Sequence, residues 1–131
     1  MNITLDKAGK RFANEWVFRN VDLSIQKGSR YAILGSNGSG KSTLAQLIAG
    51  YLSPTEGKVL CDLPDPESLP LHVSFTSPYL ELPEDYTLND QIRFHFSLKK
   101  MQAGVSSDSI CEQLQLGAAK NKPIKTFSSG M

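Results

Sequence analysis

The stretch that decides the fold is "GSNGSGKST", residues 35–43. It fits the phosphate-binding pattern GxxxxGK[ST] at every required position. The glycines at positions 35, 38 and 40 permit backbone angles and close approaches that side chains would forbid. Consecutive main-chain N–H groups can therefore turn inward around phosphate oxygens. The sequence predicts a phosphate-binding loop here.

Each residue of this loop has an expected contact with a nucleoside triphosphate. Lys41 would reach the β- and γ-phosphates and is the candidate catalytic residue, while the Ser42 hydroxyl would ligate Mg²⁺. Thr43 would add a donor near the α-phosphate. The other nucleotide-binding residues of the loop are Ser36, Asn37, Gly38, Ser39 and Gly40. The alternative is an ordinary glycine-rich turn, but such a turn needs one or two of these glycines and not the Lys–Ser pair.

The segments on either side of the loop have the pattern that its chemistry needs. "YAILG", residues 31–35, is continuously apolar, which is typical of a central strand buried on both faces. A helix is expected over about residues 41–50, where Leu44, Leu47 and Ile48 form an apolar stripe. The N-terminus of this helix would add partial positive charge beside the phosphates.

Further elements are expected on both sides of this centre. Alternation and strand-forming residues predict strands over residues 2–5, 16–20, 21–25, 58–62 and 72–75. The segment "LPDPESLPL", residues 63–71, is too rich in proline for either a helix or a strand.

The periodicity becomes helical at Thr87. Thr87 and Asp90 resemble a capping box, and apolar residues then recur at a spacing of four. A second helix is expected from about residue 107 to 116. We therefore divide the chain into a mixed α/β part, residues 1–86, and the beginning of a helical part, residues 87–131.

Composition limits the possible functions. The chain has 131 residues, of which 40% are hydrophobic, and a formal net charge of +1, so it suits one soluble domain and no nucleic-acid partner is expected. No apolar run approaches the roughly 20 residues of a membrane span, and the N-terminus lacks the apolar region of a secretory signal. We expect a cytosolic protein. Cys61 and Cys111 lack CxxC spacing and are expected to be buried or idle thiols.

Two further stretches, taken with the loop, resemble one family. They are "GKRFANE", which contains Phe12, and the closing "FSSGM", residues 127–131. Together with the loop they look like the front half of an ATP-binding cassette (ABC) ATPase, the nucleotide-binding subunit of ABC transporters. The resemblance implies an α/β P-loop NTPase with an N-terminal antiparallel β subdomain, the loop strand and helix, and the start of a helical subdomain.

The resemblance also implies roles for residues outside the loop. In the family an aromatic residue stacks on adenine, and Phe12 stands at the expected spacing, although an ordinary core position for Phe12 remains open. Val17 matches a small apolar position beside the nucleotide. Ser128 and Gly130 match the serine and second glycine of the signature motif, which contact ATP held by another subunit. A dimer with a second ABC ATPase subunit is therefore implied.

In relatives the Walker B strand follows the signature motif, so we expect this chain to be truncated before that strand. In relatives that strand carries the aspartate that binds Mg²⁺ and the glutamate that polarises water. Because a positioned general base contributes about 10²–10⁴-fold in rate, a chain without this glutamate is expected to bind ATP better than it hydrolyses it. The strand before the loop would also keep unpaired edges, which predicts self-association.

The Q-loop is a departure from the family pattern. In the family, a glutamine of this segment ligates Mg²⁺. Alignment places Ser77 at the glutamine position, so either a water bridges Ser77 to Mg²⁺ or the contact with Mg²⁺ is lost. The surrounding "SPYLELPE", residues 77–84, is either a docking surface for a multi-span membrane subunit or a plain packing loop.

Three functions remain open. The first is a transport ATPase subunit with ATP and Mg²⁺ as cofactors, peripheral on the cytoplasmic face of the membrane beside its transmembrane partner. The second is a soluble ABC protein acting on ribosomes or DNA, which the near-neutral charge disfavours. The third is a binding-only partner in an unequal pair, suggested by Ser77. Another P-loop enzyme, such as a small-molecule kinase, would leave Phe12 and "FSSGM" unexplained.

Overall fold

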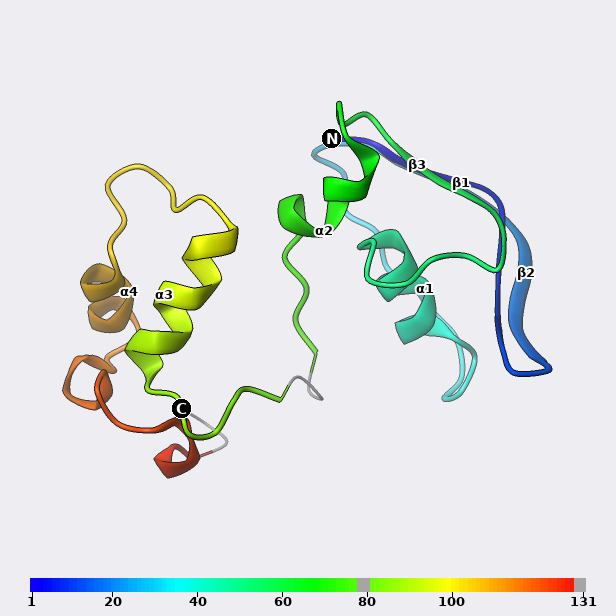
Figure 1. Ribbon diagram of the computed structural model, residues 1–131. Coiled ribbons are helices and arrows are strands. Elements are labelled where there is room, and N and C mark those ends of the chain that lie inside the picture. Colours follow the sequence, from blue (N-terminus) through cyan, green and yellow to red (C-terminus); the bar gives the residue numbers. More distant parts are fainter. Residues whose placement is uncertain (78–80, 129–131) are drawn as a thin grey trace. The chain divides into compact units, whose positions relative to one another are not determined.

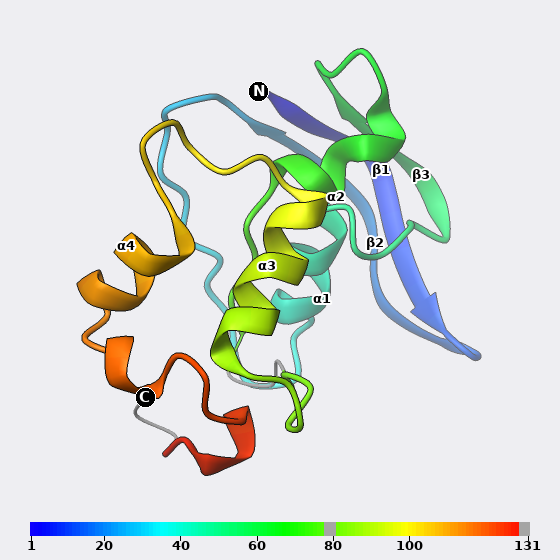
Figure 2. The same ribbon diagram turned by 60° about the vertical axis from the view of Figure 1, so that its left-hand side comes forward.

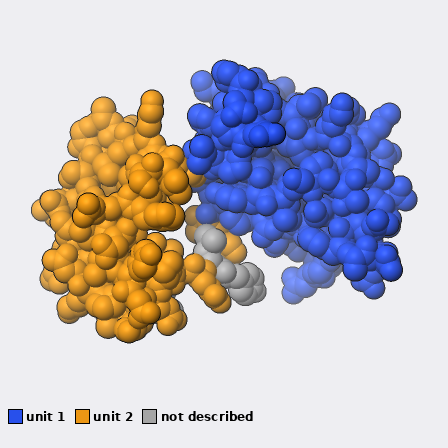
Figure 3. All heavy atoms as spheres, in the orientation of Figure 1, with its two compact units in different colours: residues 1–75 blue, residues 76–131 orange. Residues whose placement is uncertain are grey.

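The computed structural model describes residues 1–77 and 81–128. The chain divides into two compact units, residues 1–75 and 76–131, which Figure 3 shows in blue and orange. The first unit holds the sheet and the glycine-rich loop, and the second holds the two longer helices of the C-terminal part. The division expected between residues 86 and 87 stays a prediction.

The first unit is built on an antiparallel sheet. Its strands are β1 (Ile3–Phe12), β2 (Glu15–Ile25) and β3 (Glu56–Cys61). Figure 2 shows β1 between the other two, and Leu5 is paired with Leu23 on one side and Val59 on the other. The strands expected over residues 2–5, 16–25 and 58–62 are confirmed, and β1 and β2 run further than predicted.

One helix covers a face of this sheet. Helix α1 (Lys41–Ile48) follows the loop and lies against the strands in both ribbon views (Figures 1 and 2). Leu47 is completely buried in a cluster with Ile3, Leu5 and Ala8. Leu44 and Ile48 pack against the same cluster, so the predicted apolar stripe is the buried face of the helix. The core therefore fixes the start of α1 relative to the sheet.

The prediction of a strand directly before the loop is wrong. Residues 31–34 are connecting chain, and Leu34 is 89% exposed. An apolar run becomes a buried strand only when neighbouring strands pair with it. The sheet of the described residues has three strands, and none of them pairs with residues 31–34.

The interpretation of residues 63–75 is also wrong. The proline-rich part forms a 3₁₀ turn, η1 (Pro66–Ser68), followed by helix α2 (Leu69–His72). Pro66 and Pro70 stand in the first turn of these two elements, where a missing N–H costs nothing. Because His72 ends this helix, residues 73–75 follow as connecting chain and the strand expected over residues 72–75 does not form.

The second unit is helical, as predicted. Helix α3 (Leu88–Leu98) begins after a capping box in which Thr87 and Asp90 bond reciprocally. Helix α4 (Ser107–Gln113) begins at the predicted residue but ends three residues before the predicted 116. Gln115 has a φ of 57°, which is left-handed and cannot continue a right-handed helix.

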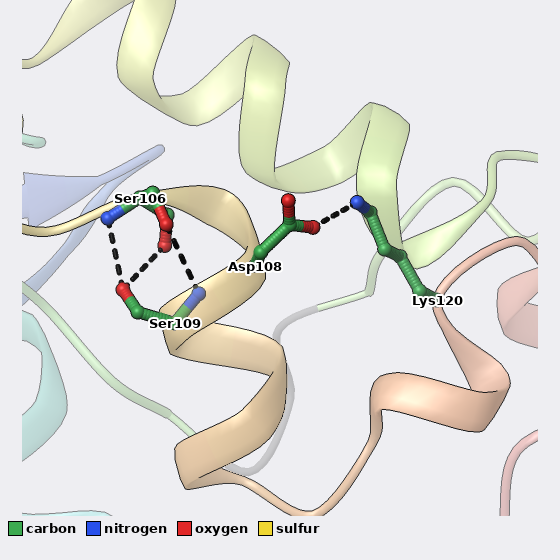
Figure 4. A network of polar contacts seen from close by, with 4 residues as sticks. All are labelled: Ser106, Asp108, Ser109 and Lys120. Atoms are coloured by element: carbon green, nitrogen blue, oxygen red, sulfur yellow. Dashed lines mark hydrogen bonds and ion pairs between the residues drawn. The ribbon is translucent and has the colours of Figure 1, made fainter.

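Polar contacts cap the start of α4 and join its first turn to the segment that follows the helix. The Ser106 hydroxyl accepts from the Ser109 N–H at 3.1 Å, and the Ser109 hydroxyl accepts from the Ser106 N–H at 2.9 Å (Figure 4). Asp108 forms an ion pair with Lys120. Two 3₁₀ turns, η2 (Gly117–Ala119) and η3 (Ile124–Thr126), lead from there to Phe127.

The two cysteines have the expected character. Cys111 is buried, Cys61 is half-buried, and both are free thiols. Within the part of the chain that the structure describes, no helix is both long and apolar enough to cross a bilayer.

Candidate functional site: the glycine-rich loop and its surroundings

The loop makes a tight turn that ends at the first residue of α1. The Ser39 N–H donates to the Ser36 carbonyl at 3.2 Å, which closes the turn. Gly38 and Gly40 have φ values of 82° and 89°, which L-residues other than glycine adopt only with strain. At Gly40 there is also no room, because a Cβ would lie 2.5 Å from Cγ1 of Val17. The glycine at position 40 is therefore required twice, by its conformation and by its neighbour.

The N-terminus of α1 presents backbone donors beside the loop. The first bond of the helix runs from the Leu44 N–H to the Gly40 carbonyl, at 2.8 Å. The N–H groups of Lys41, Ser42 and Thr43 precede it and have no carbonyl four residues back within the helix. No side chain caps this end and no acidic residue lies in the first turn. The partial positive charge of the helix is thus left for an anion.

The Lys41 ammonium lies over the loop. Its Nζ donates to the carbonyl oxygens of Gly35 and Ser36, at 3.0 and 2.7 Å. The side chain therefore folds back toward the chain that leads into the turn, and the cation lies on the same short segment as the helix N-terminus. A lysine at this position can neutralise an anion bound by the loop.

The remaining predicted residues of the loop are accessible. Ser36, Asn37, Ser39 and Ser42 are exposed, whereas Thr43 is half-buried. The described residues contain no cluster of three or more His, Cys, Asp or Glu side chains that could form a metal site of its own. Any cation at Ser42 would therefore take most of its ligands from phosphates and water, which is how Mg²⁺ is commonly bound.

Phe12 and Val17 come from the β1–β2 hairpin. Phe12 is the last residue of β1 and is 49% exposed, so it is not the core residue that the sequence left open. Val17 is half-buried on β2 and lies against Gly40, as the Cβ distance above shows. Val17 is thus in direct contact with the loop, and both residues belong to the first unit.

The other predicted residues belong to the second unit. Ser128 is exposed and follows η3, and Ser77 is half-buried. Gly130, with Ser129 and Met131, lies outside the described residues, and so do residues 78–80 of the expected docking segment. The structure therefore brings together the loop, Lys41 and Val17, and leaves the signature residues as a prediction.

Sequence reasoning missed two residues near this site. Phe18 would lie 3.3 Å from a Cβ on Gly40, and Lys10 lies 5.2 Å from the Phe12 ring. Lys10 could have been found, because residues two apart on a strand share a face. The position of Phe18 could not have been predicted, because strict alternation along a strand would place Phe18 on the opposite face from Val17. The pairing of β1 and β2 is irregular between Lys10 and Arg11, so alternation fails here.

An ion pair between Arg19 and Glu56 stabilises the hairpin. Arg19 donates to both carboxylate oxygens of Glu56, at 2.9 and 3.0 Å, and its guanidinium lies 4.3 Å from the Trp16 ring. The hydrogen bond from Arg19 lowers the pKa of the Glu56 carboxyl below its usual value. This contact joins β2 to β3 and steadies the strand that carries Val17.

The GxxxxGK[ST] turn of residues 35–43, followed directly by helix α1 at Lys41, is the arrangement of a P-loop nucleotide-binding domain. A family model described as ABC transporter matches residues 18–131. The chain belongs to this ABC transporter family.

One curated relative and two solved structures illustrate the likeness. The sulfate/thiosulfate import ATP-binding protein CysA of Thermosynechococcus vestitus is 33% identical over 119 residues, which cover 88% of this chain and 35% of that protein. The structure of an ATP-binding subunit of an ABC transporter has a TM-score of 0.82 at 20% identity, over 100% of this chain and 57% of that one.

A second solved structure is a dimeric, post-hydrolysis ATP-binding cassette with ADP and Pi bound. It has a TM-score of 0.68 at 23% identity and covers 98% of this chain and 64% of its own. At these identities the structures establish the fold. The chain spans about a third of the curated relative's length and less than two thirds of both solved chains.

Proposed function

We propose that this chain is the nucleotide-binding part of the ATPase subunit of an ABC transporter, which binds and hydrolyses ATP to drive a membrane partner. The observation that carries the proposal is the joint position of the Lys41 ammonium and the free N-terminus of α1 on one glycine turn. Membership of the family supports ATP as the ligand.

In this proposal the loop holds the triphosphate. The backbone N–H groups of residues 36–43 and the Lys41 ammonium neutralise the phosphate oxygens, and Thr43 adds a donor from the first turn of α1. Phe12 offers an exposed ring for the base, which contributes about 1–3 kcal/mol where a base stacks on an aromatic. Mg²⁺, when bound with the nucleotide, would supply further charge neutralisation, with the Ser42 hydroxyl as its protein ligand.

Turnover needs more than the residues of this site. The loop and α1, "GSNGSGKSTLAQLI", contain no Asp, Glu or His that could polarise a water. We therefore propose that the 131-residue chain binds ATP without efficient hydrolysis.

Phosphate release from Mg-ATP tests this part of the proposal. The chain is expected to turn over no faster than its Lys41→Ala variant, with Lys27→Ala as the control for loss of an exposed lysine. Turnover that depends on Lys41 but not on Lys27 would contradict it.

The proposed partners are a second ABC ATPase subunit and a multi-span transmembrane subunit. The dimeric cassette among the similar structures supports the first, and the family supports the second. The corresponding location is the cytoplasmic face of the membrane. Neither the transported substrate nor the direction of transport is part of the proposal.

The rival is a soluble ABC protein that acts on ribosomes or DNA. Affinity purification from the native source, after detergent solubilisation, separates the two. Recovery with a multi-span membrane protein supports the transporter, whereas recovery with ribosomal RNA or DNA would replace it. Ser77 suggests a binding-only role. In that case the purified complex would bind ATP without turning it over.

A further inference from the structure

Lys10 is a charged side chain beside the exposed aromatic ring of the proposed site. It lies on β1 two residues before Phe12, and its Nζ is 5.2 Å from the centre of the Phe12 ring. This distance is within the range of a cation–π interaction. Phe12 itself is 49% exposed, so the ring has accessible surface that Lys10 does not cover.

The ammonium group is held in place from its other side. Lys10 Nζ donates to the Ser53 carbonyl at 2.8 Å. The chain around Ser53 is in turn tied to β1, because the Thr55 N–H donates to the Gly9 carbonyl at 2.7 Å and the Thr55 hydroxyl accepts from the Arg11 N–H at 3.1 Å. Lys10 is therefore a tethered cation, in contrast to a freely moving surface lysine.

A tethered cation on one side of an aromatic ring has two consequences. It restricts the ring to the rotamers that keep the contact, which reduces the entropy that the ring loses when a base stacks on it. It also attracts the negative charge of the ring toward itself, so the opposite face becomes less negative and a better partner for an electron-rich base.

We propose that Lys10 is a positioning residue for the nucleotide base, acting through Phe12 by holding the ring so that one face is presented for stacking. This inference rests on the proposed function, since it requires a base to bind at Phe12. Lys10 does not itself contact the nucleotide in this account.

A competing role for Lys10 is a direct attraction to the phosphates. The hydrogen bond to Ser53 turns the ammonium toward a backbone carbonyl, and the phosphate loop has its own lysine. The two roles differ in the part of the nucleotide that they affect. Positioning acts only on a ligand that carries a base, whereas direct attraction acts on any polyphosphate.

The experiment is a double-mutant cycle read by calorimetry with two ligands, Mg-ATP and Mg-tripolyphosphate. The variants of the full chain are Lys10→Met, Phe12→Leu and the double variant. Lys10→Met is expected to weaken Mg-ATP binding about 2- to 5-fold, the magnitude of an exposed cation–π contact, and to leave tripolyphosphate binding unchanged. In the Phe12→Leu background the same change is expected to have no effect. Lys10→Arg, which keeps a cation near the ring, should restore most of the affinity.

Every other outcome contradicts either the inference about Lys10 or the proposed function. An equal loss for both ligands assigns Lys10 to the phosphates and overturns the inference, as does an unchanged affinity in Lys10→Met. If Lys10→Met loses its circular-dichroism signal, Lys10→Gln, which removes the cation but keeps a hydrogen-bond donor for the Ser53 carbonyl, carries the test. It is made once in the unmodified chain and once together with Phe12→Leu, and equal effects of Lys10→Gln in these two backgrounds overturn the inference. If the unmodified chain binds neither ligand, the proposed function itself fails.

Discussion

Two glycines of the loop have similar backbone angles and different surroundings. Gly38 and Gly40 both have left-handed φ values, at 82° and 89°. A Cβ on Gly38 would meet nothing within 4 Å, whereas a Cβ on Gly40 would overlap Val17. Variants at these two positions therefore separate the cost of a left-handed backbone angle from the cost of the contact with Val17 on β2.

Replacing each glycine by alanine should show this difference. Gly38→Ala is expected to cost about 1 kcal/mol in the free energy of unfolding, from left-handed strain alone. Gly40→Ala should cost about 1–3 kcal/mol more, because the methyl group displaces Val17. Urea denaturation measures both values, and Gly40→Ala combined with Val17→Ala should recover part of the loss. Equal costs for the two single variants would show that the contact with Val17 is unimportant.

Residue-scale prediction succeeded where the chemistry is local. The pattern from Gly35 to Ser42 specifies a turn and a helix start by itself, and both are present. The exposure of Phe12 could not be predicted, because it depends on where the hairpin ends. The contact of Phe18 with the loop depends on an irregular pairing that no alternation pattern reveals.

At the scale of elements, the start of α3 is the clearest local signal. Thr87 accepts from the Asp90 N–H at 3.1 Å, and the Thr87 N–H donates to the Asp90 carboxylate at the same distance. Thr87→Ala is expected to lower the free energy of unfolding of the helical unit by about 1 kcal/mol, the usual value of a lost N-cap. Thr87→Ser keeps the hydroxyl and is the matched control. Equal thermal denaturation of the two variants would contradict this prediction.

The same capping box predicts a pH dependence. Hydrogen bonds from Thr87 lower the pKa of the Asp90 carboxyl below its usual value of 3.8. A lowered pKa stabilises the folded state above the unfolded pKa, and this stabilisation is lost as the pH falls through the folded pKa. Thr87→Ala should therefore raise the Asp90 pKa toward 3.8, as followed by NMR titration of the carboxyl carbon. An unchanged pKa in this variant would show that the box does not form in solution.

The elements that the sequence predicted well are those with local causes. Helices α3 and α4 begin where a cap residue and helical periodicity coincide, at Thr87 and Ser106. The apolar run at residues 31–34 was misjudged because a strand depends on partners elsewhere in the chain. Proline-rich sequence disfavours helix, but at the first turn Pro66 and Pro70 are tolerated.

At the scale of the whole molecule, residues 31–34 leave apolar surface uncovered. Tyr31, Ile33 and Leu34 are 50%, 37% and 89% exposed. An apolar segment without strand partners can pair with a second chain. The chain is therefore expected to self-associate in sedimentation velocity, and Leu34→Lys should shift it toward the monomer.

Leu114→Lys is the matched control, since Leu114 is 58% exposed and lies in the other unit. It should leave the sedimentation profile nearly unchanged. A monodisperse monomer for the unmodified chain, or equal effects of both lysines, would show that residues 31–34 do not cause association.

In the proposed site, the glycine turn, the N-terminus of α1 and Lys41 together bind the phosphates of ATP. Isothermal titration calorimetry of the chain with Mg-ATP tests it most directly, alongside Lys41→Ala and the exposed-lysine control Lys27→Ala. Saturable binding is expected, retained in Lys27→Ala and weakened at least about tenfold in Lys41→Ala, since hydrogen bonds to charged groups contribute about 1.5–3 kcal/mol. Flat traces for the folded, unmodified chain, or equal affinities for all three proteins, would contradict it.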